Sequence, residues 1–198
     1  MLCVENFMDS GIFGSLVRKS FNFLISEYGF SVVKEDGFQV RFENDDVFLT
    51  VHYDANRSYE LDVEIGQLKV LFNGEERPFN LGEVLRTERA AEGRGYRALQ
   101  ASDSDALESC ITKLAALVSL NAKDYLLDNK FSFKRLSNLR EEECNQYELK
   151  MKLEGVRREA QMAWQDKDYA KVVSLYKPVE SIITEAEKKK LSFAEKHS

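Results

Sequence analysis

The chain has 198 residues, of which 43% are hydrophobic and 31% charged, and it carries a formal net charge of −6 at pH 7. This composition is typical of a globular protein that can build one large hydrophobic core or two small ones. An acidic chain gains little attraction to phosphate backbones or anionic lipid surfaces, whereas a basic protein partner would be attracted to it. The ten glycines and two prolines exclude a long linker or a low-complexity tract.

The cysteines indicate a reducing environment. Cys3, Cys110 and Cys144 are odd in number and far apart, so they form neither a disulfide framework nor a metal-binding pair. We therefore expect a cytoplasmic protein with no metal and no cofactor. We expect no signal peptide, because no basic segment precedes an apolar run. We also expect no membrane span, because no apolar run reaches about 18 residues.

An amphipathic helix is predicted near the N-terminus. Its apolar residues recur at steps of three and four: Ile12, Phe13, Leu16, Val17, Phe21, Leu24, Ile25 and Tyr28. Asp9 or Ser10 can cap its start, and Gly29 can end it in the left-handed conformation.

The apolar period then changes to two, which predicts an antiparallel meander of about four strands. A short strand near residues 31–34 is followed by runs over 38–43, 47–53 and 59–65. Acidic, Asn and Gly residues separate the runs and are typical of turns. We expect the N-terminal helix to cover the apolar face of this sheet.

The polar positions of these strands hold the first candidate site. His52 lies on one strand, and Glu60, Asp62 and Glu64 alternate along the next. The simplest interpretation is a solvated sheet face with cross-strand charge pairs. The alternative is a functional row that contacts a basic protein, binds a divalent cation or forms an enzyme site. Neither a nuclease pattern of a carboxylate followed by Glu-x-Lys nor a nucleophile elbow is present, so we predict no catalytic residues.

A second helix is predicted to begin at Asn80. Glu83 can complete a capping box with Asn80, and Phe79 can pack on Val84 as a hydrophobic staple. This helix is expected to end near Ala91.

Four arginines in this region form the second candidate site: Arg86, Arg89, Arg94 and Arg97. Together with Tyr96 they could contact phosphate or nucleic acid. Glu88 and Glu92 offset much of their charge, so a solvated loop is the simpler interpretation. Nucleic-acid binding is therefore an alternative hypothesis and not the main one.

Two further helices are predicted. The first begins near Asp105, capped by Ser102 or Ser104, and continues to about Leu127. The second extends from about Phe133 to Asp166, and its roughly 33 residues would measure about 50 Å at 1.5 Å per residue. Because this exceeds the diameter of a small domain, part of it must project, bend or pack on a partner helix. A homodimer through this helix is one such arrangement.

The segment AWQDKDYAKVVSLYKPV, from Ala163 to Val179, resembles a tetratricopeptide-type helical hairpin. Trp164 would close the first helix of the hairpin, and Asp168 with Tyr169 would open the second. The turn departs from the family pattern, because Lys167 replaces its glycine. The resemblance covers about residues 156–198 and implies one helical hairpin packed on another element, since a solenoid needs about three repeats.

Further positions belong to the same resemblance. Val172, Tyr176 and Val179 occupy positions where the family has small, aromatic and small residues. A capping box formed by Thr184 and Glu187 then opens a final helix.

The sequence therefore predicts an α+β protein. Residues 1–78 form a helix packed on an antiparallel sheet, and residues 79–198 form a helical region that packs on the sheet or stands as a separate bundle. The first part is similar in style to bacterial immunity proteins and small α+β proteins of unknown function, a similarity that implies protein binding and transfers no residue. We expect a non-enzymatic interaction module, with an enzyme or metal site at His52 and nucleic-acid binding as the alternatives.

Overall fold

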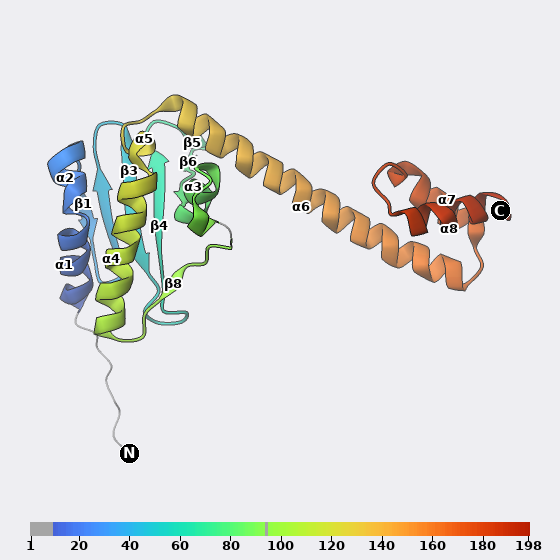
Figure 1. The fold of residues 1–198 in the computed structure, drawn as a ribbon, viewed down its shortest axis with the longest axis horizontal. Helices are drawn as coiled ribbons and strands as arrows, with labels where there is room; N and C mark the ends of the chain where they lie inside the picture. Colours follow the sequence, from blue (N-terminus) through green and yellow to red (C-terminus); the bar gives the residue numbers. More distant parts are fainter. Residues whose placement is uncertain (1–9, 94) are drawn as a thin grey trace, which may run out of the picture. The chain divides into compact units, whose positions relative to one another are not determined.

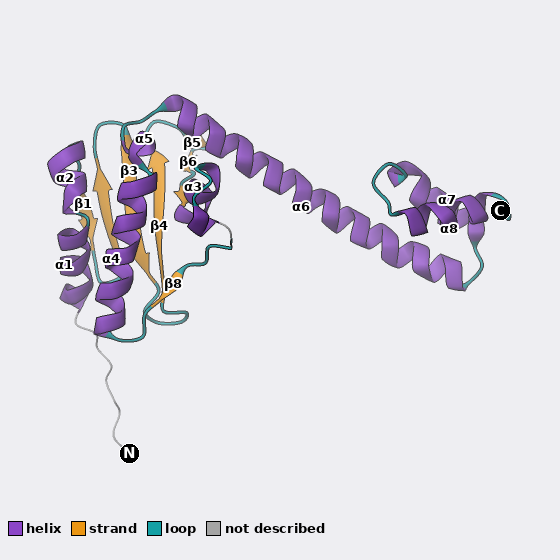
Figure 2. Cartoon of the chain, viewed as in Figure 1, coloured by secondary structure: helices purple, strands orange, loops and turns teal. Residues whose placement is uncertain are grey.

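The computed structural model describes residues 10–93 and 95–198, so Asp9, Cys3 and Arg94 lie outside the described residues. The fold is α+β, as predicted: a helical start, an antiparallel sheet and a helical C-terminal half (Figures 1 and 2). The chain divides into two compact units, Met1–Leu139 and Arg140–Ser198. None of the described helices is long and apolar enough to cross a membrane.

The predicted N-terminal helix is broken into two helices, α1 (Ser10–Ser20) and α2 (Asn22–Tyr28). The break lies at Phe21, which is fully buried. Gly29 ends α2 as predicted, with φ +70 and its backbone N–H donated to the carbonyl of Leu24.

The four predicted strands form an antiparallel meander: β1 (Ser31–Glu35), β2 (Gln39–Glu43), β3 (Val47–Tyr53) and β4 (Glu60–Gln67). Two short strands that we did not predict, β7 (Phe79–Asn80) and β8 (Leu99–Gln100), pair with the other edge of β4. A separate hairpin is formed by β5 (Leu71–Phe72) and β6 (Glu75–Glu76). Strands of two residues are too short to show an apolar period, which explains why the sequence did not predict them.

The apolar face of the sheet is covered by α1 and α4 (Ser104–Asn121), which lie side by side in Figure 1. Their buried side chains share one hydrophobic core with the strands, including Leu107, Ile111 and Leu114 of α4. The cap of α4 is Asp103, whose carboxylate accepts the N–H of Ala106, and not Ser102 or Ser104.

Three short helices complete this unit: α3 (Leu81–Thr87), the 3-10 helix η1 (Ala91–Gly93) and α5 (Lys123–Leu126). The capping box predicted at Asn80 and Glu83 is present in α3. The helical region predicted from residue 79 onward is divided between the two units, after Leu139. Residues 79–139 pack with the sheet because the apolar stripe of α4 and the buried Phe133 and Leu136 belong to its core.

The long helix α6 (Lys130–Gln165) begins three residues earlier than predicted. In the second unit it is followed by α7 (Tyr169–Tyr176), the 3-10 helix η2 (Lys177–Val179) and α8 (Glu185–Glu195). Asp168 caps α7, and the predicted capping box opens α8. These elements enclose a second, smaller core: Ala160, Ala163, Val172, Tyr176, Val179, Ile183, Leu191 and Ala194.

Candidate functional site

The candidate residues of the strands lie on the sheet face that points away from the core. His52 alternates with Val51 and Tyr53, which are buried in that core. Three rows of side chains cross β2, β3 and β4 on the polar face: Gln39–His52–Asp62, Arg41–Thr50–Glu64 and Glu43–Phe48–Gly66. Glu60 lies at the start of β4, exposed and paired with Gln100 of β8.

His52 and Glu64 meet diagonally across β3 and β4, with His52 Nε2 3.1 Å from Glu64 Oε2. Both side chains remain partly exposed. The contact is an ion pair only when the imidazole is protonated, and at this exposure it contributes little to stability. The predicted cross-strand pairing on this face is therefore present between these two residues.

Asp62 has a different role from its neighbours in the acidic row. Its Oδ1 accepts the backbone N–H of Val63 at 2.8 Å and the hydroxyl of Tyr96 at 3.5 Å. Burial raises the pKa of Asp62, and the carboxylate of Glu64 raises it further, while these two hydrogen bonds lower it.

The backbone explains why Asp62 bonds to its own strand. β8 pairs with β4 at Glu60 and Leu61, and β7 pairs with β4 at Glu64 and Ile65. Val63 lies between these short strands, where no residue of either strand pairs with it. The carboxylate of Asp62 accepts the N–H that a continuous strand would have accepted, because a buried amide needs a partner. Asp62 is therefore a structural residue of the sheet edge.

Tyr96 comes from the segment between α3 and β8 and packs closely on α3. A Cβ added at Gly82 would lie 2.9 Å from the Tyr96 ring, so this approach requires glycine. Burial raises the pKa of Tyr96 well above its usual range, and Asp62 adds to the rise. Nothing local in the sequence connects Tyr96 to Asp62, which lies 34 residues earlier.

Arg41 anchors a second part of the polar face. Its guanidinium donates to both carboxylate oxygens of Glu76 at 2.7 Å and, through Nε, to Glu43 at 2.6 Å. It also lies over the ring of Phe48, 3.9 Å from the centroid. These contacts fix the hairpin β5–β6 beside the sheet, since Glu76 belongs to β6. The bond from Arg41 lowers the pKa of Glu76.

The hairpin exposes three consecutive apolar residues. Val70, Leu71 and Phe72 are 56%, 55% and 56% exposed. The guanidinium of Arg77 lies 4.6 Å from the centroid of the Phe72 ring. Sequence reasoning missed this feature, although a Val-Leu-Phe run next to the turn residues Asn73 and Gly74 was its visible signal.

In the part that the structure describes, the arginine segment does not bring its arginines and Tyr96 together on one exposed surface. Arg86, Arg89 and Arg97 are exposed, while Arg94 lies outside the described residues. Tyr96, which could have stacked on a base, is instead half-buried against Asp62.

Glu88 of this segment bonds to side chains outside it. It accepts the hydroxyl of Tyr125 and the guanidinium of Arg135, each at 2.6 Å. Its carboxylate therefore joins the arginine segment to α5 and α6.

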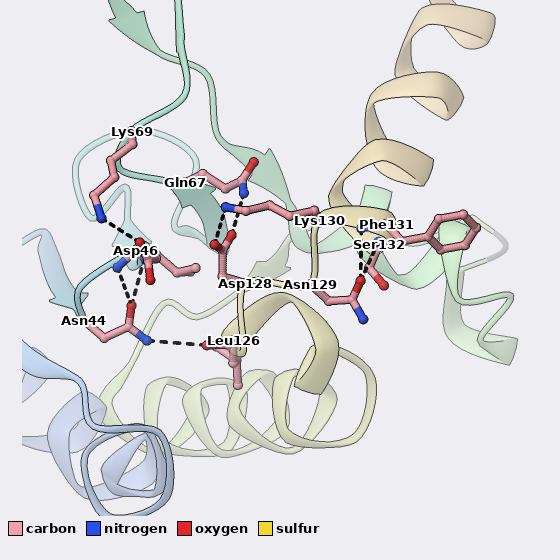
Figure 3. Close-up of polar contacts among 11 residues, drawn as sticks. Asn44, Asp46, Gln67, Lys69, Leu126, Asp128, Asn129, Lys130, Phe131 and Ser132 are labelled. Carbon is pink, nitrogen blue, oxygen red and sulfur yellow. Dashed lines mark hydrogen bonds and ion pairs between the residues drawn. The ribbon is translucent and has the colours of Figure 1, made fainter.

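A further polar cluster joins the β2–β3 turn, the end of β4 and the start of α6 (Figure 3). Asp46 accepts Lys69 Nζ at 2.7 Å, and Asp128 accepts both Gln67 and Lys130. The cluster positions the first turn of α6 on the sheet. Among the described residues, no group of three or more His, Cys, Asp or Glu side chains is arranged to hold a metal ion, at this cluster or at His52.

Comparison with known proteins found no match: no family model, curated protein or solved structure is similar to the chain. The resemblances to tetratricopeptide hairpins and to immunity proteins therefore stay predictions.

Proposed function

We propose that the chain is a non-enzymatic protein-interaction module of the cytoplasm, comparable in role to an immunity-type inhibitor or an adaptor. Its partner is a basic protein that contacts the polar face of the sheet and the hairpin β5–β6. The observation that carries the proposal is the exposed run Val70, Leu71 and Phe72, held beside that face by the Arg41–Glu76 pair.

An exposed contiguous apolar run is unfavourable in water and is typical of a protein-binding surface. The bidentate bond between Arg41 and Glu76 ties the hairpin to β2, so little conformational freedom remains to be lost on binding. Leu71 and Phe72 can act as apolar anchors, and the exposed Glu60 and partly exposed Glu64 supply the negative charge that would attract a basic partner.

The polar groups on this face support binding more than catalysis. The Asp62 carboxylate accepts the backbone N–H of Val63 and the hydroxyl of Tyr96, bonds that serve the structure of the sheet. His52 is paired with Glu64 on an open surface, where water would screen the charges that a reaction develops.

The test is affinity purification of the chain from its native cells, with Leu71→Asp as the variant. A basic protein should be recovered with the natural chain and lost with the variant, because a charge replaces an apolar anchor. Leu120→Asp is the matched control, since Leu120 is 80% exposed and lies on α4, which covers the other face. Equal recovery with both variants, or no specific protein with the natural chain, would reject the proposal.

A second arm tests the charge. Glu60→Lys should weaken binding of the recovered protein, and the loss should be greatest at low salt. Asp62 is left unchanged in this arm because its replacement would disturb the sheet edge itself.

A further inference from the structure

In the second unit, α6 carries two stripes of side chains on opposite sides, the first apolar and the second mixed. One packs against α7 and α8 and contains Leu153, Val156, Ala160 and Ala163. The other follows steps of three, four and seven residues and contains Cys144, Tyr147, Met151, Gly155, Arg158 and Met162.

The second stripe is uncovered in the part of the chain that the structure describes. Tyr147 is 64% exposed and Met151 is 49% exposed. A Cβ added at Gly155 would meet no atom within 4 Å, so this position is a shallow gap in the helix surface. Cys144 and Arg158 are exposed as well.

The charges of α6 change sign along this stripe. Residues 140–148 contain four glutamates and one arginine, and residues 149–158 contain four cations and one glutamate. Arg157 of the basic half is already paired with Glu187 of α8. Lys150, Lys152 and Arg158 therefore give the basic half its outward charge.

We propose that this stripe docks on the same stripe of a second copy of the chain, with the two α6 helices antiparallel. The stripe is symmetric about Met151: Tyr147 and Gly155 lie four residues to either side, and Cys144 and Arg158 lie seven. A two-fold axis at Met151 therefore places each Tyr147 over Gly155 of the partner subunit, so that a large side chain fills a gap.

The same axis satisfies the charges. The acidic half of each helix faces the basic half of the other, and Arg158 of the partner subunit lies beside Cys144, between Glu141 and Glu148. A parallel pair would instead oppose like charges along the whole stripe. A partner helix of one charge would match only half of it. This docking involves the second unit alone, so it is independent of the proposed sheet-face function.

Sedimentation velocity of the full chain, from low to high micromolar concentration, tests the self-association. The natural chain should shift from monomer to dimer, and Met151→Glu should raise the dissociation constant about tenfold or more, because two like charges meet at the axis. Asn145→Glu adds the same charge at an exposed position outside the stripe and should leave the constant unchanged. A natural chain that stays monomeric throughout overturns the proposal, as does equal weakening by both variants.

Disulfide cross-linking tests the orientation, in a chain carrying Cys3→Ser and Cys110→Ser. Antiparallel packing separates the two Cys144 residues by about 21 Å along the axis, from 14 residues at 1.5 Å, too far for a bond. Oxidation should therefore give dimers only after Arg158→Cys is added. Dimers formed through Cys144 alone would show parallel packing and overturn the proposal, and so would no dimer with Arg158→Cys.

Discussion

The stability of the second unit should depend on pH through Glu187. Its carboxylate accepts Arg157 Nε at 2.6 Å, Arg157 Nη2 at 3.1 Å and the backbone N–H of Thr184 at 2.7 Å. These bonds lower the pKa of Glu187 from 4.5 to about 2, the bond from Arg157 most of all. We expect Glu187→Gln to destabilise the unit at pH 7, because glutamine can keep the capping box but not the ion pair.

The size of the effect follows from the pKa. Lowering the pKa of Glu187 from 4.5 to about 2, at 1.36 kcal/mol for each tenfold change in proton affinity, gives an upper bound of roughly 3 kcal/mol. Water at the protein surface screens the pair, which leaves about 1–2 kcal/mol. Because the folded-state pKa is depressed, the contribution is complete above the unfolded pKa near 4.5 and is lost as the pH falls toward 2. The natural chain and the variant should therefore converge in acid.

Urea unfolding followed by tryptophan fluorescence provides the assay. Trp164 is the only tryptophan of the chain and packs beside the second core, 5.5 Å from the Phe193 ring, so its emission reports this unit alone. Glu185→Gln is the control, since that side chain is 83% exposed and pairs with the neighbouring Lys188. A Glu187→Gln loss no larger than the control, or one as large at pH 3 as at pH 7, would refute the reasoning.

Three substitutions in the first unit should be separable by chemical denaturation. Gly66→Ala should cost about 1–3 kcal/mol, because its Cβ would lie 2.6 Å from the buried Phe48 ring; an unchanged midpoint would contradict this contact. Asp62→Asn should leave the stability unchanged or raise it at pH 7, since it removes a desolvated charge and keeps an oxygen that accepts the N–H of Val63. Asp62→Ala should cost about 1–3 kcal/mol, because it leaves that N–H without an acceptor. Asn80→Ala should cost about 1 kcal/mol through the lost cap, and no loss would mean that Glu83 alone suffices.

The arginine segment leads to a prediction about nucleic-acid binding. The full chain should show no binding to RNA or DNA at low salt, where electrostatic attraction is strongest. Saturable binding that Arg97→Glu abolishes would instead favour the nucleic-acid alternative.

Sequence patterns predicted the strands and helix starts, which depend on interactions between residues close together in the chain. The period of two located β2, β3 and β4, and the capping boxes at Asn80 and Thr184 set the starts of α3 and α8. These features depend on residues within a few positions of one another, so one sequence is enough to find them.

The missed features depend on partners distant in the chain. The sequence placed Asp62 in a solvated row, but its environment is set by Tyr96 and by the ends of two short strands. The anchoring of hairpin β5–β6 likewise joins Arg41 to Glu76 across 35 residues. Neither contact leaves a periodic signal, because each involves single residues brought together by the sheet.

The way β7 and β8 attach to β4 also closes a loop of the chain within the first unit. Both ends of the intervening segment, residues 81–98, are attached to one strand at positions three residues, or roughly 10 Å, apart, because Asn80 pairs with Glu64 and Leu99 with Leu61. Between the two attachments, the carboxylate of Asp62 accepts the backbone N–H of Val63, so this amide of β4 has a partner. The segment between the two attachments also contributes Leu81, Val84 and Leu85 to the core. Its exposed positions, such as Arg86, Arg89 and Arg97, can vary without altering the register of the meander, so new surface chemistry can arise there at little risk to folding.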